Sequence, residues 1–250
     1  NAADTPYFNL FFHIQYIDVY RNSGIFREPG VYMIYLNIAI LFEFFLFEKA
    51  NKKHILVFIL TLLTTLSTAG FIVFILISLA YLLKLNNVKY YLQYLLFGLV
   101  TIMLVTFNLD LFESSFSKFD SDSTNYSSTI ARIASVSIPF NIFVDSPFLG
   151  VGLTNFALLY PIYSNQLYGI FMEAGGHSTN TLLNALSTYG LIYFIIITLG
   201  YYKFTRYFTN KPFIRMLIFM SFVLMLSNED LRYSILFSSL LFYGYKFLKF

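Results

Sequence analysis

The chain has 250 residues, of which 58% are hydrophobic and 12% are charged, and its 16 Lys and Arg against 13 Asp and Glu give a net charge of +3. A soluble domain has about 45–50% apolar and about 25% charged residues, so this composition excludes a water-soluble enzyme and also a disordered chain. The absence of Cys excludes a disulfide framework, a thiolate metal site and a cysteine nucleophile. A multi-pass membrane protein remains.

Seven segments are apolar around their whole circumference, which is typical of membrane-spanning helices. The expected fold is all-α, a polytopic transmembrane bundle of about seven spans in which residues 1–250 form one membrane domain. The segments are Val31–Phe47, Ile55–Thr68, Phe71–Leu83, Tyr91–Leu111, Thr181–Tyr202, Phe213–Leu226 and Tyr233–Tyr245.

The stretch from Ile55 to Leu83 is too long for one upright helix in a hydrocarbon core of about 30 Å. We therefore expect two helices joined at Ser67–Gly70. This division places eleven basic residues on one side of the membrane, which the positive-inside rule identifies as the cytoplasm. They are Lys49, Lys52, Lys53, Lys84, Lys89, Lys203, Arg206, Lys211, Arg215, Lys246 and Lys249.

The opposite side receives a large extracytoplasmic loop, residues 112–180. Within it, Ser127–Phe143 is expected to form an amphipathic helix at the outer surface, followed by a turn at Pro147 and Gly150–Gly152. The N-terminus also falls outside, yet no signal peptide precedes it and residue 1 is Asn. We expect the chain to be the C-terminal part of a longer protein with further spans upstream.

Four of the five basic residues on the outer side are arginines: Arg21, Arg27, Arg132 and Arg232. Arginine is the preferred residue where a planar fork grips phosphate or carboxylate, and topology selects against positive charge on this side. A phosphate-bearing ligand is one explanation. The other is that each arginine pairs with a nearby carboxylate, Arg27 with Glu28 or Asp18 and Arg232 with Glu229 or Asp230.

Two further residues are candidates for acid–base chemistry. Glu28 precedes Pro29 at the outer end of the first apolar segment, where a carboxylate complements a helix N-terminus but could also act as a general base. His177 follows two glycines and precedes an N-cap candidate, Ser178 or Asn180. A histidine at such a junction is more often structural than catalytic.

Several other kinds of site are not indicated. Gly150-Val151-Gly152 lacks the strand context and the third glycine of a dinucleotide loop. No cluster of His, Asp or Glu has metal-ligand spacing, and the basic residues are not arranged as in a nucleic-acid interface. We therefore expect no metal, no cofactor and no nucleic-acid partner.

Two stretches together resemble the O-antigen polymerase and O-antigen ligase superfamily of bacterial surface-polysaccharide enzymes. The first runs from Arg21 to Gly30 (RNSGIFREPG) and continues, after one helix, with Leu66–Gly70 (LSTAG). The second begins at Arg132 and contains the segments Ser146–Phe156 (SPFLGVGLTNF), His177, Asn180–Leu183 (NTLL) and Tyr189–Ile192 (YGLI).

The resemblance covers most of the chain and favours the polymerase branch. Many members have His directly followed by Asn, whereas Ser178 and Thr179 intervene here. Thr68-Ala69 stands where the ligase branch often has a basic residue. Together with the Arg-x-x-Gly-x-x-x-Glu-Pro-Gly motif, this departure from the ligase pattern indicates an O-antigen or capsule polymerase.

The resemblance implies a metal-independent glycosyltransferase in the bacterial inner membrane with its active site facing the periplasm. Donor and acceptor would be glycans on undecaprenyl pyrophosphate, and a chain-length regulator would be a possible partner. Arg21, Arg132 and Arg232, with Arg27 in reserve, would bind the pyrophosphate, and His177 or Glu28 would take the acceptor proton. The alternatives are a ligase that transfers glycan to lipid A-core in lipopolysaccharide synthesis, and a polysaccharide flippase or transporter.

Overall fold

The computed structural model describes residues 13–17, 19–47, 50–85 and 126–246. They belong to two compact units. Unit 1 comprises residues 1–86 and 205–228, and unit 2 comprises residues 87–204 and 229–250. Each unit has its own helices and its own packing, so each is described by itself.

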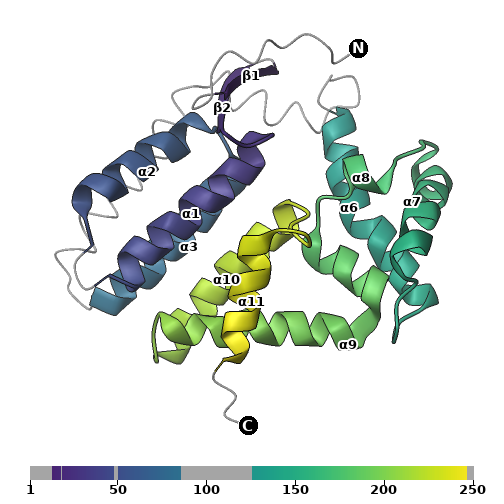
Figure 1. Cartoon of the computed structure of the whole chain (residues 1–250). Helices are drawn as coiled ribbons and strands as arrows, with labels where there is room; N and C mark the ends of the chain where they lie inside the picture. Colours follow the sequence, from purple (N-terminus) through teal and green to yellow (C-terminus); the bar gives the residue numbers. More distant parts are fainter. Residues whose placement is uncertain (1–12, 18, 48–49, 86–125, 247–250) are drawn as a thin grey trace. The chain divides into compact units, whose positions relative to one another are not determined.

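Unit 1 combines a small hairpin with apolar helices. Helix α1 packs against α2 and α3, α3 packs against α10, and β2 lies against α1 and α2 (Figure 1). The elements are β1 (His13–Ile17), β2 (Val19–Gly24), α1 (Pro29–Phe45), α2 (Lys52–Thr64), α3 (Thr68–Leu85), η2 (Thr205–Tyr207) and α10 (Pro212–Asn228).

The expected break between α2 and α3 is confirmed. Thr65 ends α2, Leu66 adopts a left-handed backbone with φ 47°, and α3 begins at Thr68. Farther along, Gly70 of α3 lies so close to Met33 of α1 that a Cβ there would be 3.0 Å from the Met33 Cβ. The glycine thus allows the two helix backbones to approach.

Basic residues gather at one end of unit 1. Lys84 Nζ donates to the carbonyl of Phe44 at 3.2 Å and lies 4.8 Å from the ring centre of Phe45. Phe45 also contacts Phe208, beside Arg206 in the chain. The hairpin lies against the C-terminal end of α2, and Lys52 and Lys53 lie at its N-terminal end. The hairpin and these lysines are therefore at opposite ends of α2.

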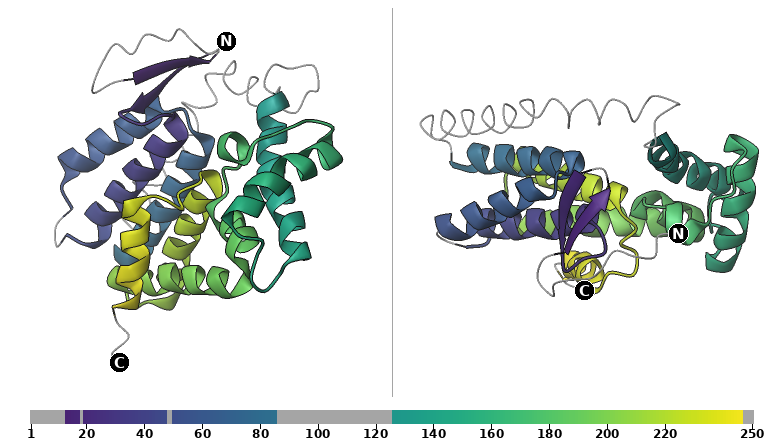
Figure 2. Two further views of the ribbon diagram at one scale, coloured as in Figure 1. Left: turned by 45° about the vertical axis from the view of Figure 1, so that its right-hand side comes forward. Right: turned by 90° about the horizontal axis from the view of Figure 1, so that it is seen from above.

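Unit 2 contains the other helices of the described chain, and α6, α7 and α8 form a local core in it (Figure 2). Its buried members are Ala134, Ile138, Ile142, Phe156, Tyr160 and Met172. The elements are α6 (Tyr126–Asp145), α7 (Leu153–Tyr168), α8 (Ala174–His177), α9 (Thr181–Phe204) and α11 (Ile235–Tyr245).

Helix α9 is broken at Gly190, and the bend is visible in Figure 1. Gly190 has φ 76° and ψ −178°, a conformation essentially restricted to glycine. Beyond the break, α9 packs against α11, where a Cβ on Gly244 would be 2.0 Å from the carbonyl oxygen of Gly200. Two glycines thus let these helices cross at close range.

Six of the seven apolar segments predicted from the sequence coincide with helices, and the fourth, Tyr91–Leu111, lies outside the described residues. Two helical segments of the described chain are long and apolar enough to cross a membrane, Thr68–Leu85 and Thr181–Tyr207. Three shorter helices, α1, α10 and α11, are also apolar. The helical class is confirmed, while the count of about seven spans stays a prediction.

The hairpin and helix α7 were not predicted, and neither were the short helices α8 and η2. The hairpin of β1 and β2 was missed because its strands are short and lie in a polar, aromatic segment without strict alternation. Helix α7 has no counterpart among the predicted helices, and it contains Pro161 in its interior. The helix predicted at Ser127–Phe143 is present as α6, Tyr126–Asp145, and its position at the outer surface stays a prediction.

Candidate active site

The turn between α6 and α7 joins the broken helix α9 by backbone hydrogen bonds. The carbonyls of Ser187 and Thr188 would bond to the next helical turn in an unbroken helix, but here they accept from Val151 N at 3.0 Å and Gly152 N at 2.9 Å. In return, Leu191 N donates to the carbonyl of Pro147 at 2.9 Å. The Pro147–Gly152 turn therefore satisfies the backbone groups that the break releases.

Only glycine fits on both sides of this joint. A Cβ on Gly190 would lie 2.2 Å from the carbonyl oxygen of Phe148, and a Cβ on Gly150 would lie 2.5 Å from the backbone of Thr188. Gly150 and Gly190 also both have positive φ. Two motifs that stand about forty residues apart in the sequence are thus one structural feature.

Arg232 lies beside this joint and is held on three sides. Its Nε donates to Asp230 Oδ1 at 2.9 Å and to Oδ2 at 3.1 Å, and one terminal nitrogen donates to Asp230 Oδ2 at 2.7 Å. The other terminal nitrogen donates to Thr188 Oγ1 at 3.0 Å. The guanidinium carbon is 5.4 Å from the ring centre of Phe156, in range for a cation–π contact.

This geometry leaves part of the guanidinium available. Arginine has five N–H groups, and the bonds to Asp230 and Thr188 engage one on each of its three nitrogens. One N–H on each terminal nitrogen has no partner among the described residues. The side chain of Arg232 is only 11% exposed, so the fork is fixed in place and suited to bidentate contact with an oxyanion.

A buried polar network supports the pair from α9. Asn184 is fully buried and donates through Nδ2 to Asp230 Oδ2 at 3.2 Å, while its Oδ1 accepts from Ser178 Oγ at 2.5 Å. Thr181 Oγ1 donates to the carbonyl of Glu229 at 2.5 Å and accepts from Leu231 N at 2.8 Å. The first turns of α9 thus fix the segment that carries Asp230 and Arg232.

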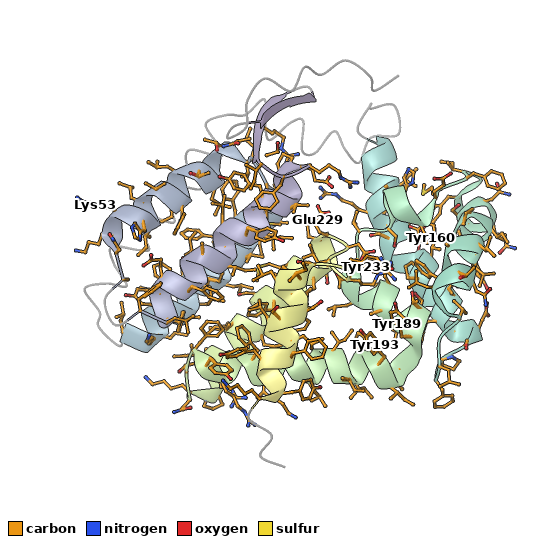
Figure 3. All side chains as sticks on the ribbon, in the orientation of Figure 1. Lys53, Tyr160, Tyr189, Tyr193, Glu229 and Tyr233 are labelled. Carbon is orange, nitrogen blue, oxygen red and sulfur yellow. The ribbon has the colours of Figure 1, made fainter. Side chains whose placement is uncertain are left out.

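Tyrosines surround this network in unit 2 (Figure 3). Tyr160 is fully buried in the core of α6 and α7, and burial raises the pKa of its hydroxyl to about 12. The Ser178 hydroxyl opposes this shift, but it donates to Asn184, and the Tyr160 hydroxyl has no hydrogen-bond partner among the described residues. Tyr189 stacks edge-on with Tyr193 at 4.7 Å between ring centres, immediately before and after the break.

His177 ends the short helix α8 and is exposed. Its Nδ1 lies 3.2 Å from the carbonyl oxygen of Glu173. A carbonyl only accepts, so this contact favours the tautomer with the proton on Nδ1 and a free lone pair on Nε2. Ser178, the next residue, connects through Asn184 to Asp230, so His177 adjoins the network that fixes Arg232.

Arg132 lies on α6 and is exposed, and its guanidinium has no hydrogen-bond or ion-pair partner among the described residues. Helix α6 packs against α7 and α9 in the same unit. Unit 2 thus contains three of the six predicted site residues: Arg132, His177 and Arg232.

The other three belong to unit 1. Arg21 Nε donates to the carbonyl of Thr65 at 3.0 Å, where it satisfies the C-terminal end of α2. Arg27 pairs with Glu28 at 2.8 Å, with side chains 79% and 36% exposed. Glu28 is the N-cap residue of α1, followed by Pro29 at the first helical position, as the structural interpretation of this motif predicts.

The sequence interpretation missed Asn184 and Thr188 and treated Asp230 only as a possible partner of Arg232. A signal was present, because Thr181, Asn184 and Thr188 recur at helical spacing in an otherwise apolar segment. The alternative prediction, that these arginines pair with nearby carboxylates, is confirmed for Arg27 with Glu28 and for Arg232 with Asp230.

Among the residues that the structure describes, no group of three or more His, Asp or Glu side chains is placed to hold a metal ion. Neither a curated protein nor a solved structure matches the chain. The family model described as O-antigen ligase matches residues 54–198, more than half of the chain, and includes the Gly150–Gly190 joint, Arg132 and His177. The chain therefore belongs to the O-antigen ligase family of membrane proteins, whose members are glycosyltransferase-like enzymes.

Proposed function

We propose that this protein polymerises oligosaccharide repeat units carried on undecaprenyl pyrophosphate, at the periplasmic face of the bacterial inner membrane. The observation that carries the proposal is the guanidinium of Arg232. It is little exposed, it is fixed by Asp230 and Thr188, and two of its N–H groups are uncommitted. A pyrophosphate needs such fixed donors.

The proposed reaction transfers a glycosyl group. An acceptor hydroxyl attacks the anomeric carbon of the donor, and the bond from that carbon to the pyrophosphate oxygen breaks. The electron pair of the broken bond stays on the pyrophosphate, whose negative charge therefore increases in the transition state. Arg232 and the exposed Arg132 in the same unit supply positive charge for this leaving group.

The acceptor hydroxyl loses a proton during the attack. We assign its removal to His177, because the contact of Nδ1 with the carbonyl of Glu173 leaves Nε2 free to accept it. Glu28, at the N-cap position of α1, is the second candidate, but its carboxylate already pairs with Arg27. Arg21 and Arg27 keep a proposed role in binding the pyrophosphate.

A ligase that transfers the glycan to lipid A-core is the second candidate function, and the description of the matching family favours it. Both reactions use the same donor and the same leaving group, so the fixed arginine serves either. They differ in the acceptor.

The contribution of Arg232 is tested in a deletion strain that carries the full-length gene. The Arg232→Gln variant is expected to lower the yield of long-chain polysaccharide by roughly 100-fold, the effect of removing one charge-stabilising donor. Arg206→Gln is the matched control, since Arg206 is an exposed arginine at the basic end of unit 1. Normal yield in Arg232→Gln with normal protein level would contradict the proposal.

Arg132→Ala is expected to abolish long chains as well.

The glycans of the deletion strain itself distinguish the two candidate reactions. Single repeat units on lipid A-core are expected if the protein is a polymerase. Long chains that remain on undecaprenyl pyrophosphate would identify a ligase instead. Unchanged glycans of full length on lipid A-core would contradict both.

A further inference from the structure

Helix α6 presents two unlike faces. Ala134, Ile138 and Ile142 are fully buried against α7 and α8. Ile133, Val136, Phe140 and Val144 are about half exposed instead. At 3.6 residues per turn, these four exposed side chains fall within an arc of roughly 80°. We call these four residues the α6 stripe.

The α6 stripe is bordered by a cation and by a second apolar feature. Arg132, next to Ile133, is exposed and has no partner among the described residues. At the other end of α6 follows the Pro147–Gly152 turn, whose tip carries Phe148 and Leu149 with 68% and 76% of their surfaces exposed. Large apolar side chains at the tip of a tight turn are typical of a contact with a nonpolar phase.

The turn is continuous with the apolar surface of α9. Leu191 N donates to the carbonyl of Pro147, so Phe148 starts beside the second half of α9. Ile192, Ile195 and Ile196 of that half are also about half exposed, and they belong to a segment long and apolar enough to cross a membrane. The exposed apolar surface of this half of α9 therefore extends directly to the turn.

From these three observations we propose that the α6 stripe and the Phe148–Leu149 tip insert into the outer surface of the bilayer, with Arg132 at the level of the lipid phosphates. An amphipathic helix in this position buries its apolar face at the boundary between headgroups and acyl chains, and a long cationic side chain at its edge reaches the phosphates.

Insertion of the turn would also set the depth of Arg232 in the membrane, whether or not Arg232 binds pyrophosphate. Thr188 accepts a hydrogen bond at its carbonyl from Gly152 and at its hydroxyl from Arg232. A turn inserted at the headgroup level thus places Arg232 close to that level. The pyrophosphate of a lipid-linked donor lies at the same level, so the substrate would reach the guanidinium without leaving the membrane.

Residues 1–250 contain no Trp. With any Trp elsewhere in the full-length protein replaced by Phe, a single introduced Trp is a unique fluorescent probe. The full-length protein carrying Phe140→Trp or Phe148→Trp is reconstituted in phosphatidylcholine vesicles whose acyl chains are brominated near the glycerol. Bromine should quench either probe at least about two-fold more than a control probe at Gln166→Trp, an exposed polar position on α7. Soluble iodide should quench the control more strongly.

A second pair of variants breaks the surface itself. Val136→Asp and Arg132→Glu are each expected to reduce the quenching of the Phe148→Trp probe by bromine about two-fold, because both place negative charge at the phosphates. Gln166→Asp should leave it unchanged.

Equal quenching by bromine at all three probe positions would overturn the inference. So would the absence of quenching at Phe140→Trp, the result expected if water or a second protein copy covers the α6 stripe. Loss of polysaccharide synthesis in a variant would not contradict membrane insertion, because the vesicle measurement requires no substrate. The two proposals can therefore fail separately.

Discussion

Two arginine–carboxylate pairs, one in each unit, have nearly the same length but different surroundings. Arg27–Glu28 spans 2.8 Å with side chains 79% and 36% exposed, whereas Arg232–Asp230 spans 2.7 Å with side chains 11% and 23% exposed. The first pair has water around it. The second also bonds Thr188 and Asn184 and stacks on Phe156.

The difference teaches that an ion pair in itself says little about function. An exposed pair gains little energy, because solvent and salt screen its charges. A pair fixed on several sides in a place with little water keeps its remaining donors in one orientation, which is what stabilisation of a transition state requires. The following substitutions test this contrast, beginning with the joint that holds the second pair in place.

The largest expected effect is on the joint itself. Gly190→Ala adds a Cβ 2.2 Å from the carbonyl oxygen of Phe148 at a position with φ 76°, which we expect to cost roughly 3 kcal/mol or more of folding free energy. Thermal unfolding in detergent measures the loss. Gly169→Ala is the control, because Gly169 has φ 66° but open space around it, so only backbone strain of about 1 kcal/mol is expected. Equal losses in the two variants would contradict the interlocked arrangement.

The next effect concerns the acid partners. Asp230→Asn weakens the grip on Arg232, and we expect transfer activity to fall roughly 10- to 100-fold through misplacement of the guanidinium. Glu28→Gln makes the same chemical change in the exposed pair, and activity should stay within about two-fold. Polysaccharide yield in complemented strains, corrected for protein level, is the measurement. A larger loss for Glu28→Gln would reverse the contrast and would favour Glu28 as the base.

Tyr160 gives a smaller, pH-dependent effect. Burial raises the pKa of its hydroxyl from 10.0 to about 12. The unfolded chain thus loses this proton between pH 10 and 12 while the folded protein retains it, and stability falls as the pH rises through that window. Tyr160→Phe should remove this part of the decline. At neutral pH the variant should be equally stable or up to about 1 kcal/mol more stable, since it removes a buried hydroxyl without a partner. Parallel pH profiles of the melting temperature for both proteins would count against this account.

The smallest effect is expected at Arg21. Arg21→Gln removes the hydrogen bond to the carbonyl of Thr65 at the end of α2, a loss of about 1 kcal/mol in stability. If that bond is its main role, activity per folded molecule should change little. A loss of activity much greater than the loss of folded protein would instead support the proposed contact of Arg21 with pyrophosphate.

The helices of this protein could be predicted from the sequence because their signal is local. Long apolar runs between polar ends defined α1, α3, α9, α10 and α11, and Ser67–Gly70 correctly divided α2 from α3. The N-cap role of Glu28 and the helix α6 followed from short motifs in the same way.

The candidate site was predictable only in part. Arg132, His177 and Arg232 were selected by residue type and expected side of the membrane, and the structure places all three in unit 2. Asn184 and Thr188 were missed, because a polar residue in an apolar helix shows its importance only when its partner, here Asp230 or Arg232, is known.

The sequence by itself thus determined that this is a helical membrane protein with a family-specific arrangement of arginines and glycines. Composition and periodicity decide those properties residue by residue. Only the tertiary structure decided that Gly150 and Gly190 form one joint, that Arg27 is an exposed pair, and that Arg232 is a fixed and partly uncommitted fork. These properties depend on burial and on contacts between residues distant in the chain, which no local pattern specifies.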